Sequence, residues 1–246
     1  MGGRLAVPLF FMISGYLFFL NTNGGIKSVV VKMRKRVRTL LIPYIIGCLF
    51  VPLFWIVMEQ IPFAARFCNG QNVSELLLGM PWNDLLSTLF YKSVDCNTPF
   101  AFQLWFLRDL IIIVAISPAL YYVRKLHGGG ILAVFLLLFG LSLLDLPFVP
   151  IQPIFWFLLG SMMLNRMSYK NVLIPISYVL LSVLEIMYPN RYVWILFDLP
   201  IKFIGIWSLW IIYDWLIHPS FLLKDHKLLT VVFQFTFFIY LFHEQH

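Results

Sequence analysis

Residues 40–58 read LLIPYIIGCLFVPLFWIVM, without a single charged side chain. An α-helix rises about 1.5 Å per residue, so a run of this length approaches the roughly 30 Å hydrocarbon core of a bilayer. Lipid offers no hydrogen-bond partner to backbone N–H and C=O groups, and a helix satisfies them internally. The stretch therefore predicts a transmembrane helix.

The rest of the chain repeats this pattern of apolar blocks separated by short polar loops. Hydrophobic residues make up 61% of the 246 residues and charged residues 12%, whereas an average soluble domain has roughly 25% charged residues. This composition excludes an ordinary water-soluble domain and predicts an all-α, polytopic transmembrane bundle of about eight helices, in one domain over residues 1–246. The predicted helices are 5–20, 40–58, 105–123, 131–146, 151–164, 172–187, 201–217 and 228–242.

The distribution of lysine and arginine orients these helices. Loops 21–39, 124–130, 165–171 and 218–227 all fall on one side of the predicted bundle, and they hold twelve of the eighteen basic residues. Basic loops stay in the cytoplasm, which makes this the cytoplasmic side. The net charge of +7 is then mainly a topological signal, with membrane lipid as a partner and nucleic acid excluded.

The densest basic segment is KMRKRVR at 32–38, directly before the helix predicted at 40–58. Guanidinium groups fork onto phosphate oxygens, so Lys35, Arg36 and Arg38 are candidates for binding the phosphates of a nucleotide-containing donor. The alternative is that the segment only fixes the topology, as basic loops commonly do.

Two further segments could serve packing or a cavity. Ser14 and Gly15 interrupt an aromatic helix, where small residues let another backbone approach closely, and Tyr16 follows them. Helix packing is the simpler interpretation, and a polar cavity is the alternative.

Trp105 begins the third predicted helix, which carries the adjacent ionisable residues Arg108 and Asp109. Charges at membrane depth usually face a polar cavity, although interfacial anchoring is also possible. Neighbours on a helix point about 100° apart, so each of the two is expected to need its own partner. Asp198 and Lys202, in contrast, are spaced i,i+4 and are predicted to pair.

The cysteines and histidines of the sequence do not show the spacing typical of a zinc site, so we predict no metal site. Cys48 is expected to pack inside a helix bundle. Cys68 and Cys96 lie in the long external loop 59–104, where an oxidising compartment would permit a disulfide without requiring one. His243 closes the last predicted helix, with Tyr240 one turn away on the same face.

Four stretches, taken in order, resemble the membrane-bound acyltransferase family three, which includes O-acetyltransferases of bacterial surface polysaccharides. The first looks like the family's second helix, the second like its basic loop, the third like its W-x-L helix entry and the fourth like its late Y-x-x-H element. They are VPLFFMISGYLF at 7–18, KMRKRVRTLLIPY at 32–44, PFAFQLWFLRDL at 99–110 and FFIYLFHE at 237–244.

The resemblance implies a multi-pass enzyme of the bacterial cytoplasmic (inner) membrane, without a bound cofactor. It would transfer an acyl group, and acetyl in particular, from acyl-CoA to a hydroxyl of a cell-surface glycan or lipid-linked sugar. Lys35, Arg36 and Arg38 would bind the donor. The residues expected around a shared cavity are Ser14, Tyr16, Trp105, Arg108, Asp109, Tyr240 and His243.

The family's catalytic histidine lies in a helix before these stretches, so the sequence leaves the catalytic residue unassigned. The chain looks like the second to ninth helices of a ten-helix enzyme, with the first and last missing. Two other functions therefore stay open: a non-catalytic multi-pass transporter and a catalytically inactive partner subunit. Transporters often contain inverted repeats, which this sequence does not show.

Overall fold

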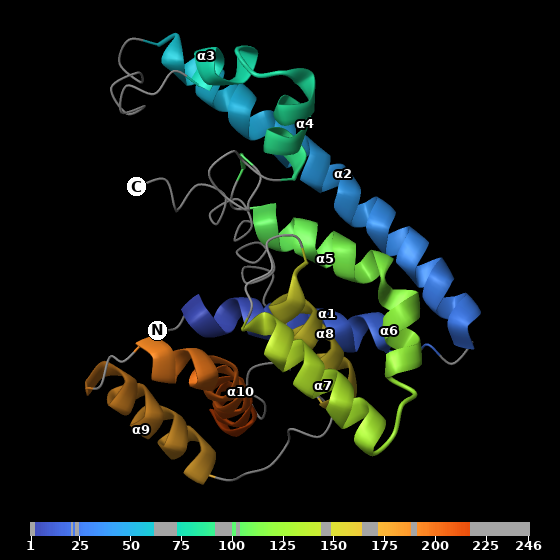
Figure 1. Ribbon diagram of the computed structural model, residues 1–246, viewed down its shortest axis with the longest axis vertical. Helices are drawn as coiled ribbons and strands as arrows, with labels where there is room; N and C mark the ends of the chain where they lie inside the picture. Colours follow the sequence, from blue (N-terminus) through green and yellow to red (C-terminus); the bar gives the residue numbers. More distant parts are fainter. Residues whose placement is uncertain are drawn as a thin grey trace. The chain divides into compact units, whose positions relative to one another are not determined.

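The computed structural model describes residues 3–20, 22, 25–61, 73–91, 100–101, 104–143, 149–163, 172–187 and 191–216. Regular structure within these ranges is helical throughout, which confirms the all-α prediction (Figure 1). The helices are α1 (Gly3–Phe19), α2 (Gly25–Glu59), α3 (Val73–Leu78), α4 (Trp82–Phe90), α5 (Trp105–Ala115), α6 (Ser117–Val123), α7 (Gly129–Ser142), α8 (Ile151–Met163), α9 (Leu173–Met187) and α10 (Arg191–Leu216).

Most predicted helices coincide with observed ones, but three expectations about boundaries were wrong. Loop 21–39 is helical from Gly25 onward, because its lysine and arginine residues are good helix formers and continue the helix beyond the apolar run. The helix predicted at 105–123 breaks at Ile116, where Pro118 lacks an N–H and its ring clashes with the carbonyl four residues earlier. Helix α10 begins ten residues before the predicted 201 and continues through Pro200.

Two further expectations concern loop 59–104 and the helix predicted at 228–242. Loop 59–104 contains the short helices α3 and α4. The helix predicted at 228–242 lies outside the described residues, as do Cys68 and Cys96.

One described helix, α2, is long and apolar enough to cross a membrane, and α5 with α6 would make a second if the two are one broken span. Helices α7, α8 and α9 and the segment Leu5–Phe19 of α1 are apolar but shorter. Only 17% of the most apolar part of α2 is buried. Its apolar side chains are therefore mostly on the surface, as those of a lipid-facing helix would be.

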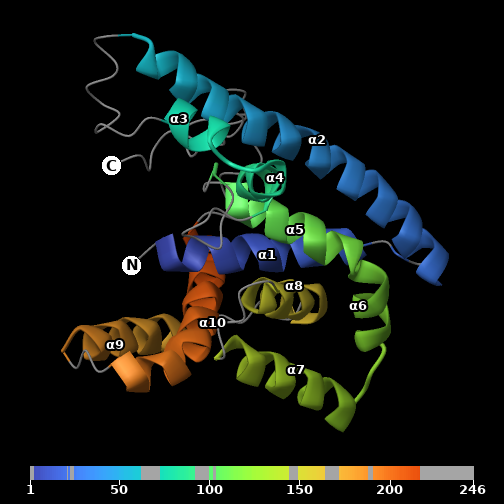
Figure 2. The same cartoon turned by 45° about the horizontal axis from the view of Figure 1, so that its top comes forward.

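The chain divides into two compact units: Met1–Lys32 with Ile116–Thr230, and Met33–Ala115 with Val231–His246. In the first unit, α1 packs on α8, α8 also contacts α7, and α9 packs on α10 (Figure 2). Phe11, Met12, Trp156 and Phe157 are buried in this unit.

Glycines allow the close crossing of α1 and α8. A methyl group placed on Gly15 would lie 1.9 Å from the carbonyl oxygen of Phe157, and one on Gly160 would lie 2.1 Å from that of Met12. Two helix backbones can approach this closely only where both carry glycine. The prediction that Gly15 admits a neighbouring backbone is confirmed.

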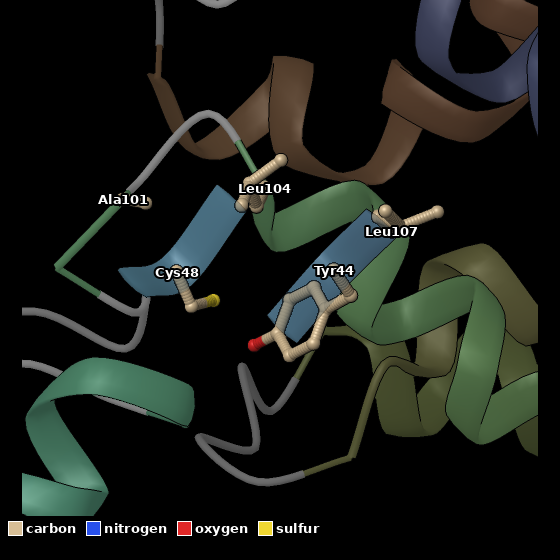
Figure 3. Close-up of a cluster of buried hydrophobic side chains, with 5 residues drawn as sticks. All are labelled: Tyr44, Cys48, Ala101, Leu104 and Leu107. Carbon is tan, nitrogen blue, oxygen red and sulfur yellow. The ribbon is translucent and has the colours of Figure 1, made fainter. Parts of the chain in front are cut away.

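The second unit has its own apolar cluster, in which α2 meets the start of α5 (Figure 3). Tyr44 and Cys48 come from α2, and Ala101, Leu104 and Leu107 lie at or near the start of α5. Cys48 is fully buried, which confirms its predicted role in packing.

Candidate functional site

The basic segment lies on a helix, and this geometry separates the predicted donor-binding residues. Lys35, Arg36 and Arg38 are all exposed on α2. At about 100° per residue, Arg36 and Arg38 point about 160° apart, and residues two apart do not face each other. Lys35 and Arg38 are spaced i,i+3 and share a face. The predicted set of three therefore divides between two sides of α2.

Lys35 and Arg38 lie on the side of α2 with exposed apolar side chains, which we call the exposed stripe. Arg38 is four residues before Ile42, and Lys35 is seven residues before it, so all three share one face. The exposed stripe consists of Ile42, Ile45, Ile46, Leu49, Leu53 and Val57, with Ile46 61% and Leu53 59% exposed.

Arg36 lies at the edge of the packed side of the same helix. Leu40 is four residues further on and packs against the apolar cluster, and Tyr44, eight residues further on, belongs to that cluster. The i, i+4, i+8 spacing places Arg36 at the end of the face that meets α5. Arg36 is thus the member of the predicted donor set closest in register to the interior of the second unit.

Lys32 has a different role from its neighbours in the segment. Its Nζ donates hydrogen bonds to the carbonyl oxygens of Phe18, at 3.2 Å, and Leu20. A cation at the carboxyl end of α1 satisfies carbonyls left without intrahelical partners and complements the helix dipole.

Arg124 also contacts the carboxyl end of α1. Its guanidinium lies 4.3 Å from the centre of the Phe19 ring, and Nη2 donates to the carbonyl oxygen of Ser161 at 3.1 Å. Burial lowers the pKa of Arg124, and the nearby Tyr121 raises it. An arginine side chain stays charged at neutral pH. Phe19, Arg124 and Ser161 thus lie close together, and each is at or near a loop predicted to be cytoplasmic; the orientation itself stays a prediction.

Arg108 and Asp109 bind each other, contrary to the expectation that each needs its own partner. Nε and Nη2 of Arg108 donate to Asp109 Oδ1 at 3.0 and 2.9 Å. The long arginine side chain curls around the helix and so bridges the 100° between neighbouring positions. Nη1 also donates to the carbonyl oxygen of Tyr91 at 2.7 Å, and the guanidinium lies 5.6 Å from the Tyr91 ring centre. Asp109 is only 4% exposed, so the pair ties α5 to the residue that follows α4.

The remaining site residues are distributed as follows. Ser14 and Tyr16 are half-buried on α1 in the first unit, whereas Trp105 is half-buried at the start of α5 in the second. Tyr240 and His243 lie outside the described residues. The shared cavity of these residues stays a prediction. The predicted pair of Asp198 and Lys202 is confirmed, with 2.6 Å between Oδ2 and Nζ.

The chain matches a known protein family. A family model described as an acyltransferase domain, that of acyltransferase family 3, matches residues 1–245. The chain belongs to this family. No protein of curated function and no solved structure matches it.

Membership in acyltransferase family 3 confirms the predicted family, and with the apolar helices it makes the chain a membrane protein. The structure of this acyltransferase domain adds residues that the sequence analysis did not single out. Gly160 could have been noticed as a small residue inside an apolar helix. Lys32 and Arg124 could not, because their partners are distant in the sequence.

Proposed function

We propose that this acyltransferase domain transfers an acyl group, acetyl in particular, from acyl-CoA to a hydroxyl of a cell-surface glycan or lipid-linked sugar in the bacterial inner membrane. The reaction breaks the thioester C–S bond of the donor and forms an ester C–O bond to the acceptor. The hydroxyl proton ends on the thiol of coenzyme A. A general base that removes this proton makes the oxygen a better nucleophile.

The observation that carries the donor proposal is the position of Arg36. It is an exposed arginine at the end of the packed face of α2, one turn before Leu40, which packs against the apolar cluster. A donor phosphate bound there would leave the rest of acyl-CoA free to extend toward the interior of the unit. We therefore narrow the donor-binding set from Lys35, Arg36 and Arg38 to Arg36, because the other two point elsewhere.

Replacing Arg36 by lysine tests the donor site. Lysine keeps the charge that fixes topology but cannot reproduce the bidentate fork on a phosphate. A hydrogen bond to a charged group is typically worth about 1.5–3 kcal/mol, so Arg36→Lys should weaken acyl-CoA binding by about tenfold or more. Isothermal titration of the purified full chain, in nanodiscs of neutral lipid, measures this affinity.

Arg38→Lys is the matched control, since it makes the same chemical change on the other side of α2. We expect it to bind acyl-CoA as the parent does. If Arg36→Lys and Arg38→Lys weaken acyl-CoA binding equally, then Lys35, Arg36 and Arg38 all remain donor-binding candidates. Unchanged binding in both would leave the segment as a topology signal, and a parent chain without acyl-CoA binding would refute the proposed donor.

The multi-pass topology is testable by labelling single cysteines, introduced as Arg36→Cys and Arg191→Cys after Cys48, Cys68 and Cys96 have been replaced by alanine. The charge asymmetry predicts that a membrane-impermeant maleimide added outside intact cells reacts at position 191 and not at 36. Reaction at 36 from outside would reverse the orientation, and reaction at both would remove the predicted arrangement of helices.

A further inference from the structure

We infer that Lys35 and Arg38, at the end of the exposed stripe of α2, bind the phosphates of anionic lipid headgroups. This surface is separate from the proposed donor site, and it gives a partner to the two basic residues that the helix turns away from Arg36. Lys35 and Arg38 meet three requirements of such a site: they lie on the lipid-facing side of α2, at the depth of the headgroups, and their side chains bind phosphate.

Lys35 and Arg38 lie on the same face of α2 as the exposed stripe. Ile42, Ile46, Leu49 and Leu53 expose about half of their surface or more, and lipid chains are the medium that such side chains prefer in a membrane protein. Lys35 and Arg38 continue this face by one to two turns. A lipid molecule whose chains lie along the stripe therefore has its headgroup next to these two residues.

The depth follows from the length of the uncharged part of α2. Residues 39–58 contain no charged side chain, and Arg38 and Glu59 flank them. At 1.5 Å per residue this segment is about 30 Å long, which matches the hydrocarbon core of a bilayer. With 39–58 in the core, Arg38 lies at its boundary and Lys35 one turn further out. That is the depth of lipid phosphates.

The chemistry selects an anionic lipid. The arginine fork and the lysine ammonium both donate to phosphate oxygens. A zwitterionic headgroup balances its phosphate with a cation of its own, whereas an anionic headgroup leaves the phosphate charge available. Each basic residue near an anionic surface contributes about a fivefold increase in affinity for that surface.

The experiment compares two single substitutions that remove one charge each from nearly opposite sides of the same helix. The full chain carrying Arg38→Gln or Arg36→Gln is placed in detergent, and bound phosphatidylglycerol and phosphatidylcholine are counted by native mass spectrometry as each lipid is titrated. We expect Arg38→Gln to weaken phosphatidylglycerol binding about fivefold and Arg36→Gln to weaken it less than twofold. Neither should change binding of phosphatidylcholine.

Three results would overturn the inference. Equal weakening by both substitutions would show diffuse attraction of the whole basic segment, without a site on one face. No weakening by Arg38→Gln would show that the residue does not bind the headgroup. Weakening of acyl-CoA binding by Arg38→Gln, with lipid binding unchanged, would assign this phosphate site to the donor.

Arg38→Lys separates loss of the site from loss of the fold, since it keeps a cation at the same depth and should retain preference for phosphatidylglycerol. Failure of the proposed acyltransferase function would appear as absence of acyl-CoA binding in the parent. The lipid measurements are read separately from that result, so the two ideas can fail independently.

Discussion

Gly160→Ala should destabilise the packing of α1 on α8 by about 3 kcal/mol or more. The added carbon would lie 2.1 Å from the carbonyl oxygen and 2.4 Å from Cα of Met12. Both are backbone atoms, so the two helices would have to separate instead of a side chain rotating away. Overpacking usually costs about 1–3 kcal/mol, and more where backbones must move. The free energy of unfolding, measured by denaturant titration in mixed micelles, tests this expectation.

Gly140→Ala is the matched control. It makes the same change inside an apolar helix, α7, where the new methyl group would have no neighbour within 4 Å in the described part of the chain. Alanine is the better helix former, so stability should stay the same or rise by about 0.5–1 kcal/mol. Equal stability of Gly160→Ala and the parent would contradict the close crossing of α1 and α8.

Asp109→Leu should cost about 3–5 kcal/mol of stability, because it removes the carboxylate that accepts two hydrogen bonds from the mostly buried Arg108 guanidinium. Thermal unfolding of the purified chain, followed by tryptophan fluorescence, would measure the loss.

The double variant Arg108→Met with Asp109→Leu completes the cycle. Replacing both partners of a buried ion pair by apolar residues is often close to neutral, so the double variant should be more stable than Asp109→Leu alone. A double variant with the summed loss of both single variants would show that the two residues act independently. Loss of acyl transfer in a fully stable double variant would give the pair a functional role in place of the structural one.

The sequence alone determined the features that depend on local chemistry. The apolar runs specified the helices, since a chain that must satisfy its backbone hydrogen bonds away from water has little choice of secondary structure. The close approach at Gly15 could be predicted because only a small residue permits it. The pair of Asp198 and Lys202 followed from an i,i+4 spacing on one helix. In each case, the residues that decide the outcome are near one another in the sequence.

Tertiary structure decided the features that depend on distant partners or on where a helix ends. Lys32 and Arg124 contact the carboxyl end of α1 because folding brings them to Phe18 and Phe19. No local sequence pattern predicts these contacts. Arg108 pairs with its neighbour because Tyr91, seventeen residues away, helps to hold its guanidinium in place. The sequence predicts the basic segment as a loop, in which its charges could converge. The extension of α2 to Gly25 turns Arg36 away from Lys35 and Arg38, since a rigid helix holds side chains at fixed angles and a loop does not.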